Sequence, residues 1–378
     1  MTKLLITTGI YPPDIGGPAT YSYHLTEEFE KIGSEIKIVA YGEGKANNNQ
    51  QEVHFVSRQY NLFSRYFKYF CIVFNLSAKA DLVYCLDLVS AGLPTILAAK
   101  LRGKKIVFRF GGDFLWEKAF QNGWTKKSLA EYYSSTKSIK EKLLFQFCFW
   151  LLKGADRIIF SSNLQAGIYL KYYRIPPHKV TIINNPIQRP QIFDTEAKKE
   201  NRVIFAGRLI KLKNIPALIK AFSEVNVVDS KLLIFGEGPE EDNLRRVIRE
   251  LKIEDRVIVN QPVNQNELIE NLQRSKFFIL PSFTEISPNI ALECLSIFKP
   301  ILITKENGLD PAVTAHLLAI DPFSINDMRA KIEFLLDDNN LKNYENELRR
   351  VVIEKNDWLD VAKKHLELFQ NVIDNKKI

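Results

Sequence analysis

The sequence contains few of the residues that bind metals or form covalent frameworks. Its 378 residues include four cysteines, five histidines and two methionines. Cys71, Cys85, Cys148 and Cys294 are scattered along the chain without any Cys-x-x-Cys pair, which indicates core packing in a reducing compartment and argues against a disulfide scaffold or a zinc site. Because no histidine stands at metal-ligand spacing from a cysteine or an aspartate, we predict that the protein holds no metal.

Long apolar runs are missing as well. The longest, Leu143 to Leu152, has ten residues and is interrupted by Gln146, which is about half of what a bilayer span requires. The first residues lack the extended apolar region and the small-residue cleavage site of a signal peptide. We therefore expect a cytoplasmic protein, and a peripheral place on the inner face of the membrane if it touches one.

Basic residues are unevenly distributed along the chain. There are 52 Lys and Arg against 44 Asp and Glu, a net charge of +8. Residues 1–186 hold 24 basic and 14 acidic residues, a net +10, whereas residues 187–378 hold 28 and 30, a net −2. A basic first half predicts an anionic partner: nucleic acid, a phosphorylated substrate or a membrane surface. Since no recognition helix or RNA-reading aromatic strand is visible, we expect no nucleic acid.

One stretch of the basic half mixes cations with aromatic residues. The segment from Arg58 to Phe70, RQYNLFSRYFKYF, has three cations among six aromatics. This composition suits a helix that lies on anionic lipid, and it also suits a buried helix whose cationic side chains reach the surface. Together with the apolar residues 145–152 and the charge, it predicts an anionic membrane surface as a partner.

Short apolar runs alternate with longer amphipathic stretches, the pattern of β-α-β units around parallel sheets. The chain is longer than the ~250–300 residues at which one core usually stops growing. We predict an α/β protein with two Rossmann-like domains, residues 1–186 and 187–356, and a final helix over residues 357–378. The predicted strands are Lys3–Thr8, Glu35–Ala40, Leu82–Cys85, Lys105–Phe110, Arg157–Ser161, Val180–Ile183, Arg202–Phe205, Lys231–Phe235, Arg256–Val259, Phe277–Leu280 and Pro300–Ile303.

The strongest group of polar residues follows the predicted strand Phe277–Leu280. A loop carries Glu285, Ser287 and Pro288 look like the N-cap and first residue of a helix, and Glu293 lies farther along that helix. A helix N-terminus at the carboxyl end of a parallel strand favours a phosphate. Two carboxylates beside it suit the hydroxyls of a sugar nucleotide. The alternative is a capped surface helix with solvated glutamates.

A second group follows the first strand of the second domain. Gly207 permits a tight turn, and Arg208 and Lys213 supply two cations five residues apart. Such a pair suits a diphosphate, because the planar Arg side chain can donate two parallel hydrogen bonds and Lys supplies a point charge. The alternative is that both are solvated basic residues in a Lys-rich loop, which is what we expect for Lys211.

Other catalytic and nucleotide-binding signatures are absent. There is no Gly-x-Ser-x-Gly or Walker sequence, and Gly236-x-Gly238 is followed by Glu241 where a dinucleotide fingerprint requires a third glycine. No Asp-x-Asp follows a strand, so we expect fixed cations and a helix end, instead of a divalent ion, to hold a diphosphate.

Taken together, these motifs resemble the retaining family-4 glycosyltransferases of GT-B fold, over essentially the whole chain. The resemblance is carried by Gly-Arg-Leu-x3-Lys at 207–213, Phe-Gly-Glu-Gly-Pro at 235–239, Glu-x7-Glu at 285–293 with Lys-Pro at 299–300, Gly-Gly at 16–17 and Asn-Pro at 185–186. It implies two Rossmann-like domains whose parallel sheets face each other across a cleft, an acceptor domain followed by a donor domain. It also implies that the final helix packs back on the first domain.

The resemblance further implies transfer of a hexose, with retention of configuration, from a UDP-sugar or GDP-sugar to a hydroxyl of a glycan or polyprenyl-linked acceptor. No cofactor besides that substrate is implied, and surface polysaccharide biosynthesis is the expected setting. Arg208 and Lys213 would hold the diphosphate, Glu285 the donor sugar and Glu293 the ribose. The donor site implied in this way contains Gly16, Gly17, Gly207, Arg208, Lys213, Gly236, Pro262, Val263, Glu285, Ser287, Asn289, Ile290 and Glu293.

The sequence departs from the family pattern at several positions. Asn214 stands where Gly often follows the clamping Lys, a tolerable change because Asn also adopts left-handed conformations. A histidine that many members carry in the first domain is missing, and Asp113 is the polar group nearest to that place. We predict that Asp113 is a fourth catalytic residue, beside Arg208, Lys213 and Glu285, that contacts donor sugar or acceptor, unless it caps the next helix. Trp116 and Glu117 are the other candidates for an acceptor pocket, although a buried aromatic would also explain Trp116.

Two other functions stay open at this point. A sugar-nucleotide epimerase or hydrolase of the same fold would use Glu285 as acid or base. A non-catalytic module would bind the nucleotide sugar without releasing diphosphate.

Overall fold

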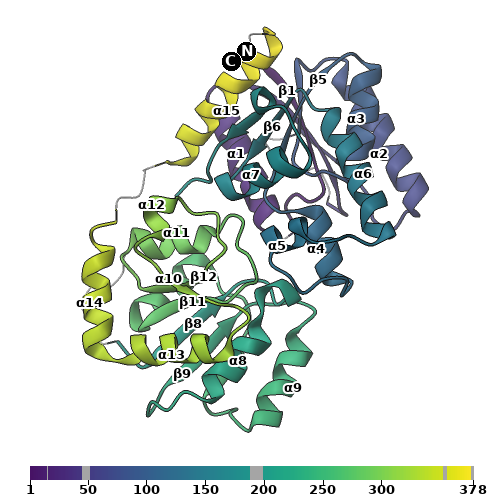
Figure 1. The fold of residues 1–378 in the computed structure, drawn as a ribbon. Helices are drawn as coiled ribbons and strands as arrows, with labels where there is room; N and C mark the ends of the chain where they lie inside the picture. Colours follow the sequence, from purple (N-terminus) through teal and green to yellow (C-terminus); the bar gives the residue numbers. More distant parts are fainter. Residues whose placement is uncertain (15, 45–51, 188–198, 352–355, 376–378) are drawn as a thin grey trace. The chain divides into compact units, whose positions relative to one another are not determined.

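The computed structural model describes residues 1–14, 16–44, 52–187, 199–351 and 356–375. The chain divides into two compact units (Figure 1). Unit 1 comprises Met1–Trp116, Ser135–Pro186 and Asn356–Ile378, and unit 2 comprises Glu117–Ser134 and Ile187–Lys355.

Unit 1 is built on a seven-stranded, all-parallel sheet in the order β3-β2-β1-β4-β5-β6-β7. Its central strands are apolar on both faces, as expected for a parallel sheet covered by helices on both sides. The strands are β1 (Lys3–Thr8), β2 (Glu35–Tyr41), β3 (Glu52–Val56), β4 (Leu82–Cys85), β5 (Lys105–Phe110), β6 (Arg157–Phe160) and β7 (Val180–Ile182).

Two layers of helices cover this sheet (Figure 1). Helices α1 (Gly17–Lys31) and α15 (Trp358–Ile373) pack together on one face. The other face carries α2 (Leu62–Ser77), α3 (Gly92–Leu101) and α6 (Ile139–Lys153), with α3 in contact with both neighbours. Helix α7 (Asn163–Tyr172) follows β6, and its C-cap residue Tyr173 stacks on Phe145 of α6 at 4.3 Å between ring centroids.

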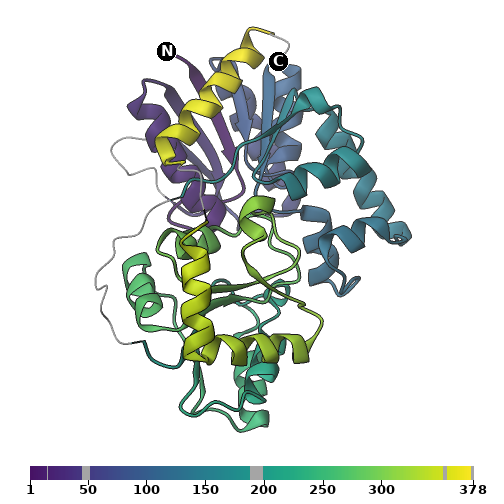
Figure 2. The same cartoon turned by 60° about the vertical axis from the view of Figure 1, so that its left-hand side comes forward.

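The last helix is part of the core of unit 1 (Figure 2). Asp357 and Asp360 form a capping box at the start of α15. Phe369 packs on Tyr84 of β4 and Phe29 of α1, with ring centroids 4.9 Å and 5.9 Å away. His365 is fully buried with Nδ1 2.7 Å from the Val361 carbonyl oxygen, and burial lowers its pKa to about 3, so its imidazole is neutral at physiological pH.

Unit 2 is built on a six-stranded, all-parallel sheet in the order β10-β9-β8-β11-β12-β13. The strands are β8 (Arg202–Ala206), β9 (Lys231–Phe235), β10 (Val257–Asn260), β11 (Phe277–Leu280), β12 (Ile301–Thr304) and β13 (Leu318–Ile320). The helices of this part of the chain are α8 (Ile215–Ser223), α9 (Glu241–Leu251), α10 (Gln265–Arg274), α11 (Asn289–Ser296), α12 (Pro311–Thr314), α13 (Ile325–Leu336) and α14 (Asp338–Leu348).

These two sheets confirm the predicted fold class of two parallel, Rossmann-like α/β units. Each predicted strand is present within one residue at either end. The list of predicted strands lacked β13, a three-residue edge strand, and β3, whose Glu52 and His54 interrupt the apolar pattern.

Residues 117–134 differ from the prediction of an uninterrupted first domain, because they cluster with unit 2. This segment contains the end of α4 (Phe114–Gln121) and all of α5 (Leu129–Ser134). The Glu306 carboxylate accepts hydrogen bonds from the Ser128 hydroxyl (2.8 Å) and the Ala130 amide (3.1 Å). The Leu129 amide donates to Thr284 Oγ1 at 2.9 Å. These bonds cap α5 with side chains from the loops after β11 and β12, which fixes the segment to unit 2.

Candidate functional site

The predicted donor residues of unit 2 lie in loops at one edge of its sheet. All of its strands are parallel, so the loops that follow them share the carboxyl edge. The strand order reverses between β8 and β11, and in open α/β sheets ligands bind at this reversal. The loop after β8 carries Arg208 and Lys213, and the loop after β11 carries Glu285.

Lys213 and Glu285 form an ion pair at this reversal. Lys213 Nζ lies 2.6 Å from Glu285 Oε1, with the two side chains 23% and 9% exposed. The Ser282 hydroxyl donates to the same carboxylate oxygen, and the Phe283 amide donates to the Leu212 carbonyl at 3.1 Å, which ties the two loops together. The structure thus brings together two predicted catalytic residues that are 72 positions apart in the sequence.

The backbone around Glu285 is held on both sides. Its amide donates to the Glu306 carbonyl at 3.0 Å, and its own carbonyl accepts from the Gly308 amide at 2.7 Å. Glu285 and Asn307 form an isolated parallel bridge. These backbone contacts fix the segment that carries the Glu285 carboxylate, and groups already held in place are what electrostatic catalysis requires.

Close backbone packing joins the loops that follow β8 and β9. The Gly207 amide donates to the Phe235 carbonyl at 3.0 Å, and the Leu209 amide to the Glu237 carbonyl at 2.8 Å. A Cβ at Gly236 would lie 2.0 Å from the Gly207 carbonyl oxygen, and the φ of Gly236 is +155°. Only glycine fits at position 236, so the predicted glycines of this loop set the shape of the edge next to Arg208.

Arg208 itself is exposed, and the ion pairs found in the described part of the chain do not include it. The residue after Lys213 has a left-handed conformation, since Asn214 has φ 53° and ψ 30°. Its side-chain amide donates to the Pro322 carbonyl at 2.7 Å. Asn214 therefore takes the place of the expected glycine in the predicted way.

Helix α11 begins one residue later than predicted. Its first residue is Asn289, and Pro288 occupies the N-cap position without making a side-chain capping hydrogen bond. The prediction that Ser287 is the N-cap is therefore wrong; the φ of −80° and ψ of 79° at Pro288 keep it outside the helix. Asn289 and Ile290 open the helix, so their amides belong to its positive end.

Glu293 lies on α11 and contacts the first residue of α10. Its pKa is raised to about 7 by burial, and a hydrogen bond with the Gln265 side chain partly offsets this rise. Gln265 is the first residue of α10 and follows Pro262 and Val263 closely, so the predicted ribose carboxylate and this loop are neighbours. With this pKa the carboxyl group is only partly ionised at neutral pH, and its ionised form is the one that can accept hydrogen bonds from both hydroxyls of a diol.

The remaining predicted residues belong to unit 1, apart from Glu117. Gly16 is the N-cap of α1, Gly17 is its first residue, and a Cβ at Gly17 would meet no atom within 4 Å. Asp113 is fully buried and accepts a hydrogen bond from the Trp116 amide at 2.8 Å, which is the helix-capping alternative. Trp116 is buried as well. A contact of Asp113, Trp116 or Glu117 with an acceptor stays a prediction.

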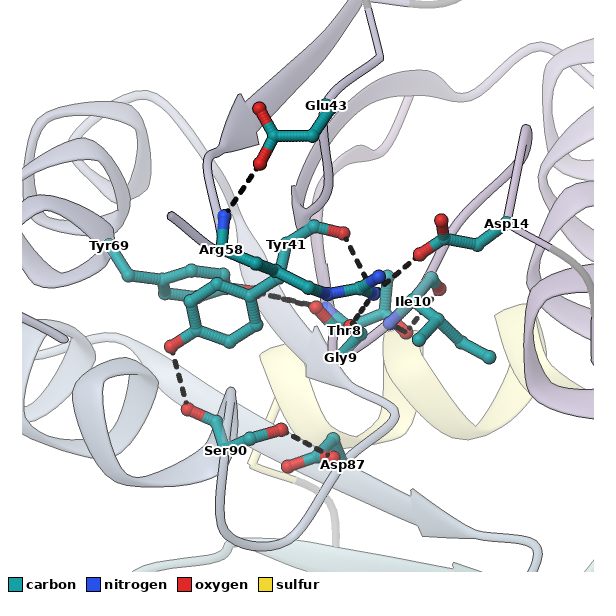
Figure 3. Close-up of polar contacts among 10 residues, drawn as sticks. All are labelled: Thr8, Gly9, Ile10, Asp14, Tyr41, Glu43, Arg58, Tyr69, Asp87 and Ser90. Atoms are coloured by element: carbon teal, nitrogen blue, oxygen red, sulfur yellow. Dashed lines mark hydrogen bonds and ion pairs between the residues drawn. The ribbon is translucent and has the colours of Figure 1, made fainter. Parts of the chain in front are cut away.

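Unit 1 has a polar cluster that the sequence analysis missed (Figure 3). It lies where the strand order of the first sheet reverses, between β1 and β4. Arg58, after β3, donates to the Asp14 carboxylate and to the carbonyls of Gly9 and Tyr41, both at 3.3 Å. The Glu43 carboxylate accepts from the Arg58 amide at 2.9 Å. A cation is thus fixed across the loops that follow three strands.

The other side of this cluster is acidic (Figure 3). Asp87, two residues after β4, accepts hydrogen bonds from the Ser90 hydroxyl (2.8 Å) and the Ala91 amide (2.9 Å). A Cβ at Gly9 would lie 2.8 Å from Asp87 Oδ2, so this carboxylate touches the backbone after β1. Two of these positions carry a sequence signal, because Gly9 and Asp87 closely follow buried strands. Asp14 and Arg58 join them only through the fold.

Across the described ranges, no three His, Cys, Asp or Glu side chains gather in a way that could hold a metal ion. No described helix combines the length and the apolar character that a membrane crossing requires.

Comparison with known protein families matches both halves of the chain. The model of "Glycosyltransferase Family 4" matches residues 15–189 and that of "Glycosyl transferases group 1" matches residues 188–359. The change from one family model to the other falls at residues 188–189, next to the boundary between units at Pro186 and Ile187.

Relatives in the curated set are similar but distant. D-inositol 3-phosphate glycosyltransferase of Pseudarthrobacter chlorophenolicus is 25% identical over 242 residues, which cover 59% of this chain and 58% of the relative. A Campylobacter jejuni enzyme, N-acetylgalactosamine-N,N'-diacetylbacillosaminyl-diphospho-undecaprenol 4-alpha-N-acetylgalactosaminyltransferase, is 26% identical over 240 residues, covering 60% of this chain and 63% of the relative. The alignments thus span about three fifths of each relative's length.

The fold has close counterparts among solved structures. Anabaena Alr3699/HepE, solved in complex with UDP-glucose, has a TM-score of 0.74 at 14% identity and covers 98% of this chain and 100% of its own. Both matched family models describe glycosyltransferases, and together they match residues 15–359, while the likeness to the Anabaena protein shows a shared two-domain α/β fold.

Proposed function

We propose that this protein is a retaining glycosyltransferase that transfers a hexose from a nucleoside diphosphate sugar to a hydroxyl group. The observation that carries the proposal is the Lys213–Glu285 pair, 2.6 Å apart at the reversal of strand order in unit 2. In this proposal the Lys213 cation binds a diphosphate and the Glu285 carboxylate beside it binds a sugar, and Arg208 follows β8 in the loop that leads to Lys213.

The step that the enzyme must accelerate is the departure of the diphosphate. Negative charge grows on the leaving oxygens in the transition state, so cations already in place stabilise the transition state more than the ground state. An ammonium group has three protons, so Lys213 can keep its bond to Glu285 and still donate to a phosphate oxygen. The planar guanidinium group of the exposed Arg208 also binds the diphosphate in this proposal, and the dipole of α11, whose N-terminus is positive, stabilises the same negative charge.

Glu285 and Glu293 bind different parts of the donor in this proposal. Glu285 contacts the sugar hydroxyls in this proposal, because its oxygens accept hydrogen bonds and its backbone is fixed. Glu293 binds the ribose hydroxyls, and the loop with Pro262 and Val263 receives the base. The nucleotide is a UDP or GDP conjugate, and the UDP-glucose complex of the Anabaena protein supports a uracil base. The donor needs no metal in this proposal, since fixed cations hold the diphosphate.

The acceptor is a glycan or a polyprenyl-linked sugar bound by unit 1, in surface polysaccharide biosynthesis on the cytoplasmic side of the membrane. The undecaprenol-linked substrate in the name of the Campylobacter relative supports this class. We propose that the acceptor meets the cluster of Figure 3, where Asp87 and Arg58 offer opposite charges to hydroxyl and phosphate groups.

The test is a product assay with UDP-, GDP- and ADP-sugars, with and without an extract of lipid-linked oligosaccharides. The proposal predicts release of one nucleoside diphosphate that depends on the acceptor, and a product with the anomeric configuration of the donor by NMR. An altered sugar without acceptor would indicate an epimerase, and diphosphate release without acceptor would indicate a hydrolase. Nucleotide binding with no turnover under any condition would indicate a binding module, and each of these three results would overturn the proposal.

A further inference from the structure

Exposed apolar side chains gather on one face of unit 1. Of the 19 large apolar residues that are exposed in the described chain, eight lie on α2, α3 and α6. These three helices form the layer on one side of the sheet (Figure 1). The eight residues are Leu62, Phe63, Phe67, Leu97, Leu101, Ile139, Leu143 and Trp150.

The apolar residues form stripes along the two longer helices. On α2, Phe63, Phe67, Phe70 and Phe74 are spaced i, i+4, i+7, i+11, and none of them is buried. Phe63 and Phe67 stack with ring centroids 6.4 Å apart, and Phe70 and Phe74 stack at 5.8 Å. This spacing defines a single face of a helix. Phe63 is 82% exposed, so the stripe ends in a side chain that the protein itself does not cover.

Helix α6 repeats this arrangement. Ile139, Leu143, Gln146 and Trp150 have the same spacing and are all exposed. Between the two stripes, Leu97 and Leu101 of α3 are exposed at spacing i, i+4.

The charges on this layer have one sign. The three helices contain six basic residues and one acidic residue, Glu141. Glu141 is buried and its carboxylate accepts hydrogen bonds from the Ser138 amide and hydroxyl at 2.9 Å and 2.6 Å, so it adds no exposed negative charge. The basic residues are Arg65, Lys68, Lys100, Lys140, Lys142 and Lys153.

The cations lie beside the apolar residues. Lys140 and Lys142 are three residues from Leu143 and Ile139, one helical turn away. At the end of α3, Arg102 donates to the Phe74 carbonyl at 3.0 Å and stacks on the Phe74 ring at 3.7 Å. Apolar side chains with cations at their edges are the pattern of an interfacial surface, in which rings enter the acyl boundary and cations contact lipid phosphates.

We propose that the exposed face of α2, α3 and α6 is a docking surface for an anionic lipid bilayer. A second copy of the chain fits this face poorly, because a two-fold contact would oppose cations with the same cations. The absence of exposed negative charge on the residues of these three helices matches a surface of negative headgroups instead. The inference goes beyond the proposed reaction and does not depend on which donor or acceptor is used.

The test is vesicle flotation of the full chain with phosphatidylcholine vesicles that either contain or lack phosphatidylglycerol. We expect binding to the anionic vesicles only, weakened by added salt. Replacing Phe63 and Phe67 together by Ser (F63S/F67S) should weaken partitioning at least about tenfold. Replacing Lys140 and Lys142 together by Gln (K140Q/K142Q) should weaken it about fivefold per lysine.

Matched controls use exposed residues of the same kind elsewhere in the chain. Val228→Ser with Leu251→Ser, and Lys342→Gln with Lys363→Gln, should bind as the unchanged protein does. F63S/F67S should keep its melting temperature and its turnover of a soluble acceptor, so that a failed fold or a failed reaction is recognised separately. Equal binding to both vesicles, or variants that bind like their controls, would overturn the proposal. A dimer that F63S/F67S dissociates, in a protein that ignores vesicles, would assign the face to a second copy instead.

Discussion

The Lys213–Glu285 pair allows the structural and the catalytic role of one residue to be separated. Replacing Lys213 by Ala removes a cation whose Nζ is 2.6 Å from a carboxylate that is 9% exposed. Loss of one partner from a buried pair costs about 3–5 kcal/mol. Because the Lys213 side chain is 23% exposed, water screens part of this interaction, and we expect a loss of about 2 kcal/mol.

This loss corresponds to a measurable change in melting temperature. In a unit of this size, 1 kcal/mol lowers the melting temperature by about 2–4 °C, so Lys213→Ala should lower that of unit 2 by about 4–8 °C. Adding Glu285→Gln removes the uncompensated charge and should restore most of the melting temperature. Turnover should behave differently: Lys213→Ala should lower it more than tenfold, which corresponds to ~1.4 kcal/mol of transition-state stabilisation, and the second substitution should not restore it.

The assay is calorimetric melting beside steady-state release of nucleoside diphosphate, with Lys211→Ala as the matched control. Lys211 is an exposed cation two residues away in the same turn, and its removal should change neither quantity. Turnover of Lys213→Ala near that of the unchanged protein would remove Lys213 from the mechanism. Turnover that returns with the melting temperature in the double variant would reduce Lys213 to a structural role.

Three further predictions concern the same edge. Donor affinity should rise with pH through about 7, where Glu293 ionises, because only the carboxylate accepts hydrogen bonds from both ribose hydroxyls; Glu293→Gln should abolish this dependence in titrations with a nucleotide sugar. Gly236→Ala places a Cβ 2.0 Å from the Gly207 carbonyl oxygen, so it should lower the melting temperature by at least about 6 °C. Glu306→Ala removes the acceptor of the Thr284 hydroxyl, 2.7 Å away, and of two groups of the 117–134 segment, and should make that segment sensitive to limited proteolysis.

Each of these predictions has a control or a contrary outcome. In the protein without ligand, the pH dependence has the opposite direction: burial raises the pKa of the Glu293 carboxyl, so the stabilisation present below about 4.5 should be lost as pH rises through about 7. Gly17→Ala should leave the melting temperature unchanged, since a Cβ there meets no atom within 4 Å. An affinity independent of pH, a stable Gly236→Ala variant or a resistant 117–134 segment would contradict the respective argument.

The sequence was most informative where burial decides the structure. Leu82–Cys85 and Phe277–Leu280 are short apolar runs with a polar residue two positions after each, and both are fully buried strands. A parallel sheet requires such runs, so the fold class could be predicted. Edge strands such as Leu318–Ile320 are partly exposed and lack this signal.

Contacts between distant segments were predictable only in part. Lys213 and Glu285 were recognised because each follows a strand, and parallel strands bring their carboxyl ends to one edge. The contact of Arg58 with Asp14 depends instead on the paths of two loops over 44 positions, which no local pattern specifies. Asp113 shows a second limit of prediction from the sequence. A carboxylate that precedes a helix can either cap the helix or bind a ligand, and only the hydrogen bond that Asp113 accepts from the Trp116 amide identifies it as a cap.

The central claim is that the loops after β8 and β11 bind a nucleoside diphosphate, and a thermal-shift titration tests it most directly. UDP, GDP, ADP and their sugar conjugates would be titrated against the unchanged protein and against Arg208→Ala. A ligand at about 100 times its dissociation constant adds about 2.7 kcal/mol, which raises the melting temperature by about 5–10 °C for a unit of this size. We predict such a shift with one nucleotide and its loss in Arg208→Ala. No shift with any of them, or an equal shift in both proteins, would contradict the claim.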